Sequence, residues 1–267
     1  MIAWIDHRFV LRSVPLSVAG SVFRCGVGLF ETILYHANEL PRFERHLKRL
    51  RTSLAALPIA PNGPPPILGE SERVREVVME VIQANSLVGK TARVNLFCFQ
   101  DAPEDKASLC VAATPHSIHA DSTCTLDVYP HAHTSHLCAH KTMANMHQRL
   151  AWNQARSAGK DDAVLQDHDG LILECAVAAL LFSDGQRFYT SRTPFKLPSL
   201  TMEAAAQALT IEEIPIALAD IGSFKHAYRL NSLIGIQPVA AIGKMAFEPD
   251  WQTCKPLSRK FLGLSEE

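Results

Sequence analysis

Apolar positions in the first half of the chain follow two different spacings, which predict helices and strands in alternation. Residues 42–57 and 70–87 carry an apolar side chain every three or four positions, the period of an amphipathic helix with one buried face. Shorter apolar or alternating runs, separated by glycine, proline and polar residues, predict strands. The predicted strands of this half are residues 2–6, 9–18, 30–36, 91–99 and 108–114.

The second half of the chain continues this alternation of strands and helices. Residues 163–174 predict a hairpin, because the turn signal Asp169-Gly170 separates two apolar runs. The predicted helices are residues 143–159, 198–209 and 255–264. The remaining predicted strands are residues 123–131, 180–182, 187–190, 213–218, 226–232 and 238–243.

A polar connector at residues 114–122 separates the two halves. It predicts a small N-terminal α/β domain over residues 1–116 and a larger C-terminal domain over residues 117–267. With 267 residues, the chain is long enough for a sizeable buried core. The predicted fold class is therefore α/β, in two domains.

Composition excludes several classes of partner. The 26 basic and 27 acidic residues nearly cancel, so we expect neither a nucleic acid nor an acidic membrane surface as partner. No uncharged apolar run is long enough to span a membrane, and the start of the chain does not resemble a secretion signal. The seven cysteines form no Cys-x-x-Cys pair, which favours reduced thiols in a cytoplasmic protein over disulfides or a zinc site.

Candidate chemistry centres on Lys141, just before the helix predicted at 143–159, and Glu174, at the end of the predicted hairpin. This pair resembles the core of the class IV aminotransferase family, the fold-type IV enzymes that use pyridoxal 5′-phosphate. In that family the lysine carries the cofactor as a Schiff base, and the glutamate pairs with the pyridine nitrogen. A carboxylate keeps that nitrogen protonated, and only then does the cofactor stabilise a carbanion. Lys141 can also act as a general base once substrate displaces it.

The resemblance implies that the C-terminal domain carries the cofactor lysine and contains a mixed, barrel-like sheet. It also implies three sets of phosphate-binding residues. Arg49 lies in HLKRL and resembles the family's HxxRL helix, whose arginine binds the phosphate. Leu200 and Thr201 lie in LPSLTM, where the family usually has LPGITR at the start of a helix. Asn231 and Ser232 lie in RLNSLIGIQPV, which matches a late strand and loop near the phosphate.

Substrate-side residues are also implied by the resemblance. GVGLFETI, residues 26–33, resembles a family strand that faces the active site, which makes Thr32 a candidate. Arg93 is a candidate anchor for a substrate carboxylate, and its alternative interpretation is an exposed arginine on an edge strand. The chain departs from the family pattern at four places: Arg24-Cys25, Ala179 for asparagine, Ser199 for glycine and Met202 for arginine.

The predicted function is a lyase similar to 4-amino-4-deoxychorismate lyase, which releases pyruvate and forms 4-aminobenzoate for folate synthesis. NSLIGIQPV, and Met146 where branched-chain aminotransferases have a tyrosine, favour this branch. One alternative is an aminotransferase acting on a D- or branched-chain amino acid. Another is a degenerate, non-catalytic family member. The resemblance also implies a homodimer that acts on a small-molecule amine.

Two further groups of residues have simpler interpretations. Five histidines resemble a metal cluster but lack a carboxylate or cysteine at ligand spacing, so no metal is predicted; they are His131, His133, His136, His140 and His147. Asp162, Asp167 and Asp169 surround the hairpin and are interpreted as turn formers.

Overall fold

The computed structural model describes residues 1–102 and 104–264, and the chain divides into two compact units. The first unit contains residues 1–118 and 140–145, and the second contains residues 119–139 and the described residues from 146 on. The division at 118/119 lies two residues from the predicted boundary. Residues 140–145, which include Lys141, fold with the first unit although they follow the start of the second in sequence.

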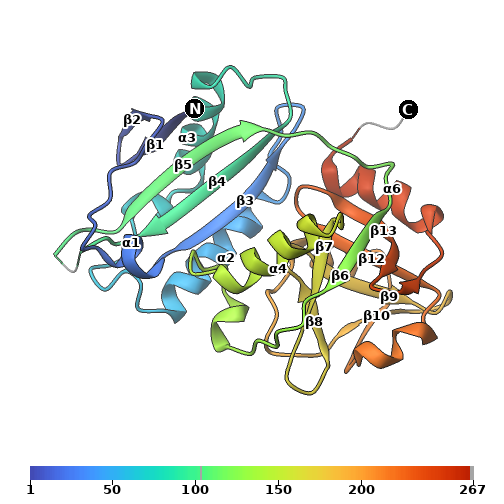
Figure 1. Ribbon diagram of the computed structural model, residues 1–267. Coiled ribbons are helices and arrows are strands. Elements are labelled where there is room, and N and C mark those ends of the chain that lie inside the picture. The colour runs from blue at the N-terminus through green and yellow to red at the C-terminus, as the bar shows by residue number, and fades with distance from the viewer. Residues whose placement is uncertain (103, 265–267) are drawn as a thin grey trace. The chain divides into compact units, whose positions relative to one another are not determined.

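The first unit is built on a five-stranded antiparallel sheet with the order β2-β1-β5-β4-β3 (Figure 1). Helices α2 (Phe43–Ala56) and α3 (Ser71–Ala84) cover one face, because their apolar stripes pack against the inward residues of the sheet. A short helix, α1 (Ser21–Cys25), and a 3-10 turn, η1 (Pro66–Gly69), complete the unit. The strands are β1 (Ile2–Ile5), β2 (Arg8–Leu11), β3 (Leu29–Tyr35), β4 (Ala92–Phe99) and β5 (Ser108–Pro115).

One strand prediction in this unit is wrong. Residues 9–18 were expected to continue as a strand, but β2 ends at Leu11. The next residue, Arg12, has a φ of +69°, a left-handed conformation that turns the chain out of the sheet. Pro15 follows and has no N–H to donate to a strand ladder.

The second unit contains a nine-stranded mixed sheet with the order β11-β10-β9-β12-β13-β6-β7-β8, and β14 pairs with β13 (Figure 1). Strand β6 is parallel to both of its neighbours, and β10 is parallel to β11. The sheet curls into a half-barrel, as predicted. Its strands are β6 (Cys124–Val128), β7 (Asp162–Gln166), β8 (Ile172–Cys175), β9 (Ala179–Ser183), β10 (Phe188–Ser191), β11 (Ile211–Ile214), β12 (His226–Asn231), β13 (Gly235–Ile242) and β14 (Met245–Ala246).

Helices of the second unit pack around this sheet. Helix α4 (Met146–Ser157) buries Ala151 and Ala155 against residues of β7 and β8. Helices α5 (Leu200–Ala205) and α6 (Trp251–Leu262) pack with β12 and β13. Two 3-10 turns are η2 (His136–Ala139) and η3 (Leu218–Ser223). No helix among the described residues is long and apolar enough to cross a membrane.

Two helices begin elsewhere than predicted. Helix α4 starts at Met146 rather than Met143, because residues 140–145 pair with β3 instead. Helix α6 starts at Trp251 rather than Lys255: the side chain of Asp250 accepts a hydrogen bond from the N–H of Thr253 and caps the helix. The mixed α/β architecture itself is confirmed.

Candidate active site

Lys141 lies in the short segment 140–145, which runs along the edge of the first unit's sheet. The N–H of Phe30 donates a hydrogen bond to the carbonyl of Lys141 at 2.9 Å, and the N–H of Met143 donates to Gly28 at 2.8 Å. Because β3 is the last strand of the sheet, its outer backbone groups have no strand partner, and this segment pairs with them. The backbone of residues 141–143 is thereby held against the start of β3.

Glycines in GVGLFETI permit this close approach. A Cβ at Gly28 would lie 2.5 Å from the sulfur of Met143 and 3.1 Å from the carbonyl oxygen of Cys98. Gly26 has a φ of +65°, and a Cβ there would lie 3.2 Å from the backbone of Ala144. The motif therefore has a structural reason in this chain: it lets the segment that carries Lys141 lie against β3.

The side chain of Lys141 lies over the ring of Phe30, with Nζ 4.5 Å from the ring centroid. Phe30 and Thr32 alternate with the core residues of β3, so they share the sheet face that points away from α2 and α3. The amide of Asn95 on β4 donates to Thr32 Oγ1 at 2.9 Å, and Arg93 Nε donates to Asn95 Oδ1 at 3.0 Å. The structure thus brings Lys141, Thr32 and Arg93 to one face of the sheet.

Arg49 lies on α2 and forms a two-pronged ion pair with Glu31 of β3, with both N–O distances 2.7 Å. His46, one turn earlier on α2, places Nδ1 2.7 Å from Glu31 Oε2. Glu31 and His46 are almost completely buried. Burial alone would raise the pKa of Glu31, but hydrogen bonds from His46 and Arg49 outweigh it and lower the pKa to about 2. This network fixes the plane of the Arg49 guanidinium.

His46 takes part in this network in its neutral form. Burial, together with the charges of Arg49 and Arg42, lowers the pKa of His46 more than the Glu31 carboxylate raises it. A neutral imidazole has one N–H, and we assign it to Nδ1 because that atom faces the Glu31 carboxylate.

Glu174 lies on β8 in the second unit, where its Oε1 accepts a hydrogen bond from the N–H of Leu197 at 3.2 Å. It lines a cavity of about 360 Å³ together with Lys196 and Ser199. Lys196 contacts the carbonyl of Ser191 and lies 3.6 Å from a carboxylate oxygen of Glu213. The cavity wall therefore contains one lysine among the described residues, Lys196, which the sequence analysis did not select.

Leu200 and Thr201 are buried in the first turn of α5. The Ser199 side chain caps this helix by accepting a hydrogen bond from the N–H of Met202 at 3.2 Å. Serine in place of the family's glycine therefore supports the helix start. Thr201 Oγ1 is buried and has no hydrogen-bond partner among the described residues.

Asn231 ends β12 and joins two turns of the second unit. Its Nδ2 donates to the carbonyl of Val177 at 3.0 Å, and its Oδ1 accepts from the N–H groups of Leu233 and Ile234 at 2.9 and 3.0 Å. Ser232 lies in the second of these turns. Val177 lies just after Glu174, so Asn231 links the Glu174 turn to the loop that contains Ser232.

The comparisons with known proteins identify the family. A sequence model described as amino-transferase class IV matches residues 28–242. The chain belongs to the class IV aminotransferase family. A search of curated proteins finds no match.

Solved structures share the fold of this family member at low sequence identity. A branched-chain aminotransferase from Thermoproteus uzoniensis has a TM-score of 0.85 at 19% identity, covering 100% of this chain and 96% of that one. The Escherichia coli branched-chain aminotransferase has a TM-score of 0.82 at 17% identity, covering 100% and 96%. A candidate 4-amino-4-deoxychorismate lyase from Legionella pneumophila has a TM-score of 0.78 at 21% identity, covering 95% of each chain.

Enzymes of the class IV aminotransferase family use pyridoxal 5′-phosphate, which confirms the predicted cofactor and enzyme class. The residues present fit this group. The buried Thr201 hydroxyl has no hydrogen-bond partner among the residues that the structure describes, and it can donate to a phosphate oxygen. Glu174 is a carboxylate whose Oε1 accepts a backbone N–H, and Lys141 is an amine on an anchored backbone segment, the two kinds of group that the chemistry of this cofactor needs.

The histidines that resemble a metal cluster, and the aspartates around the hairpin, lie outside this chemistry. The rings of His133 and His147 stack with their centroids 4.3 Å apart, and Tyr129 contacts His147 edge-on. Among the residues that the structure describes, no group of three or more histidine, cysteine, aspartate or glutamate side chains could hold a metal ion. The histidine group therefore includes an aromatic cluster.

Asp167 forms a turn, because its Oδ1 accepts the N–H groups of Asp169 and Leu171. The interpretation of Asp162 as a turn former is wrong: it is the first residue of β7, and its carboxyl is completely buried. The residues described above that the sequence analysis did not select are Glu31, His46, Asn95 and Lys196. One signal was available, since Glu31 interrupts an inward-facing series of apolar residues along its strand.

Proposed function

We propose that this family member is a pyridoxal-phosphate-dependent lyase similar to 4-amino-4-deoxychorismate lyase, and that Lys141 is its catalytic residue. The observation that carries the proposal is the anchored segment around Lys141, which shares a sheet face with Thr32 and Arg93. Substrate would be a small amine that carries a carboxylate. Arg93 suits the carboxylate because a guanidinium forms two parallel hydrogen bonds to it.

The bound cofactor supplies an electron sink for negative charge at a substrate carbon. In our proposal, Lys141 Nζ removes the proton from that carbon. The Phe30 ring beneath Nζ favours the resulting ammonium, because an aromatic face attracts a cation. When the cofactor is bound, Glu174 would hold the proton at its ring nitrogen. Its phosphate would be held by Arg49, Thr201, the backbone of Leu200, Asn231 and Ser232.

A second candidate function is an aminotransferase acting on a D- or branched-chain amino acid. The high structural similarity to branched-chain aminotransferases motivates it, although those structures are 17–19% identical to this chain. Both reactions begin with removal of the same proton, so Lys141 and Glu174 serve either one. NSLIGIQPV and Met146 support the lyase instead.

The test is a visible absorption spectrum of the purified protein with pyridoxal phosphate, before and after borohydride. We expect a band that borohydride removes in the wild type and that Lys141→Ala lacks. Lys196→Ala is the matched control, because Lys196 is a second amine that lines the cavity beside Glu174. A band lost in Lys196→Ala and kept in Lys141→Ala would overturn the assignment of Lys141.

Reaction assays then separate the candidate functions. Pyruvate release from aminodeoxychorismate without an amino acceptor supports the lyase. Amino transfer to a 2-oxo acid supports the aminotransferase. A cofactor band with neither activity would favour the non-catalytic alternative.

We also propose that the protein is a cytoplasmic homodimer. Light scattering after gel filtration would test the homodimer, because it measures the molar mass of the particle in solution.

A further inference from the structure

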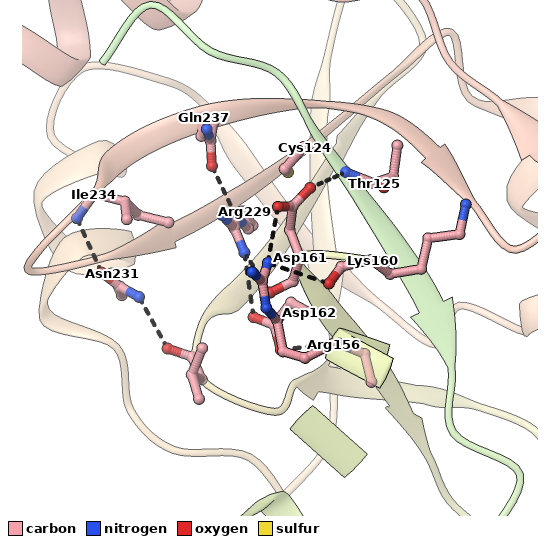
Figure 2. Close-up of polar contacts among 12 residues, drawn as sticks. Cys124, Thr125, Arg156, Lys160, Asp161, Asp162, Arg229, Asn231, Ile234 and Gln237 are labelled. Carbon is pink, nitrogen blue, oxygen red and sulfur yellow. Dashed lines mark hydrogen bonds and ion pairs between the residues drawn. The ribbon is translucent and has the colours of Figure 1, made fainter. Parts of the chain in front are cut away.

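A buried ion pair lies behind the turn that follows Glu174. Asp162, the first residue of β7, has no exposed surface, and its Oδ2 lies 3.8 Å from Nη1 of Arg229 on β12. Arg229 is itself only 13% exposed. Its Nε donates to Gln237 Oε1 at 2.8 Å, and Nη1 donates to the carbonyl of Asp161 at 3.4 Å (Figure 2). The guanidinium is therefore held by Gln237 on β13 and by Asp161, just before β7, and it lies beside the Asp162 carboxyl.

The Asp162 carboxyl faces the turn at residues 176–178. Its Oδ1 accepts the N–H of Ala163, whose carbonyl accepts the N–H of Ala176 at 2.8 Å. The N–H groups of Ala176 and Val177 favour the charged form of the carboxyl. On its other side, the turn is held by the bond from the Asn231 amide to the Val177 carbonyl. Residues of β7 and β12 thus contact the same turn.

We propose that Asp162 and Arg229 are positioning residues for the cofactor site, which fix the turn at 176–178 and through it Glu174 and Asn231. This inference rests on the proposed function. The pair reaches both candidate cofactor segments of the second unit: the turn starts two residues after Glu174, and Arg229 lies two residues before Asn231 on the same strand. Loss of the pair changes the orientation of the Glu174 carboxylate without removing any group that touches the cofactor.

An ion pair with a purely structural role would affect only the global free energy of unfolding. The test therefore needs measurements at the turn and at the cofactor site. The first is hydrogen exchange of the Cys175, Ala176 and Val177 amides in cofactor-free protein. The second is the Kd for pyridoxal phosphate, from absorbance titration. Asp162→Asn keeps the size of the side chain and removes its charge. We expect about tenfold faster exchange at the turn and about tenfold weaker cofactor binding, the loss of roughly one charge-assisted hydrogen bond.

Matched variants separate positioning from a general loss of structure. Arg156→Met breaks a neighbouring pair that is exposed, with Arg156 Nη1 3.4 Å from Asp161 Oδ1, and should leave both quantities at the wild-type value. Arg229→Lys keeps a charge beside Asp162 and loses the bond from Nε to Gln237, so it should lie between Asp162→Asn and the wild type. If Asp162→Asn does not fold, Arg229→Lys reports the same two quantities.

Unchanged exchange and an unchanged Kd in Asp162→Asn and Arg229→Lys would overturn the positioning role while leaving the proposed function standing. Faster exchange across the whole second unit, with no excess at residues 175–177, would also overturn it. A wild type that does not bind the cofactor would instead contradict the proposed function.

Discussion

Two buried carboxylates, one in each unit of the molecule, face an arginine and have pKa values shifted in opposite directions. Glu31 is 1% exposed and Asp162 is 0% exposed, so both lose the same solvation. Glu31 receives two hydrogen bonds from Arg49 and one from His46, all at 2.7 Å, and its pKa falls to about 2. Asp162 lies 3.8 Å from its arginine, and burial raises its pKa to about 6.

The difference between the two sites is in hydrogen bonding rather than in the presence of an opposite charge. Burial costs a carboxylate several kcal/mol of solvation, and an arginine restores this only through well-placed N–H groups. The Arg229 guanidinium lies 3.8 Å from Asp162 Oδ2, beyond hydrogen-bond distance, and donates to Gln237 and to the carbonyl of Asp161 instead. We infer that the Glu31 network contributes to stability, whereas the Asp162 pair is held at a cost that a positioning role would explain.

Among substitutions that test this difference between Glu31 and Asp162, we expect Glu31→Gln to have the largest effect on the free energy of unfolding. It leaves Arg49 beside a neutral side chain and should lower the free energy of unfolding by about 3–5 kcal/mol, the usual result of breaking a buried pair. Urea denaturation measures it. A loss below about 1 kcal/mol would mean that the Glu31 network resembles an exposed pair.

The pH dependence of stability should separate the two carboxylates. The folded pKa of Glu31 lies below its ordinary value of 4.5, so its contribution is present above pH 4.5 and is lost as the pH falls toward 2. The folded pKa of Asp162 lies above its ordinary value of 3.8, so its contribution is present below pH 3.8 and is lost as the pH rises through 6. Each change amounts to at most roughly 3 kcal/mol.

Urea unfolding of the wild type and two variants between pH 3 and pH 8 would measure this. The advantage of the wild type over Glu31→Gln should shrink toward low pH. Its stability relative to Asp162→Asn should decrease between pH 4 and pH 6. Equal slopes in both comparisons would contradict the opposite shifts.

A smaller effect is expected from Asp162→Asn at pH 7. The substitution leaves the buried Arg229 beside a neutral side chain, which lowers stability, but it also removes a poorly solvated charge, which offsets part of that loss. We expect a loss of about 1–2 kcal/mol in the free energy of unfolding. A loss as large as that of Glu31→Gln would break the comparison, because the two pairs would then be energetically equivalent.

The smallest effect is expected at the surface. Arg73 pairs with Glu76 at 2.8 Å on α3, and both side chains are exposed. Glu76→Gln should leave the free energy of unfolding nearly unchanged, and added salt should reduce any remaining difference, because solvent and ions screen an exposed pair. A larger effect would show that geometry alone, without burial, decides the strength of such pairs.

Local patterns in the sequence were sufficient for the elements and for several site residues. The apolar stripes of residues 42–57 and 70–87 predicted α2 and α3, because a helix is set by residues three and four positions apart along the chain. The motifs around Lys141 and Glu174 indicated the family, which the sequence model then confirmed. Strand ends were less predictable, as β2 shows, because a left-handed residue ends it without a glycine as signal.

What the sequence by itself determined is therefore the order of elements, the family and the candidate lysine. The tertiary structure decided which charged residues meet. Arg229 follows Asp162 by more than sixty positions, and no periodicity relates them. Likewise, the Lys141 segment finds its partner only in the folded protein, where β3 is the last strand of its sheet. The outer backbone groups of β3 bond to this segment instead of to another strand. Such pairings depend on strand order and burial, which arise when distant segments pack together.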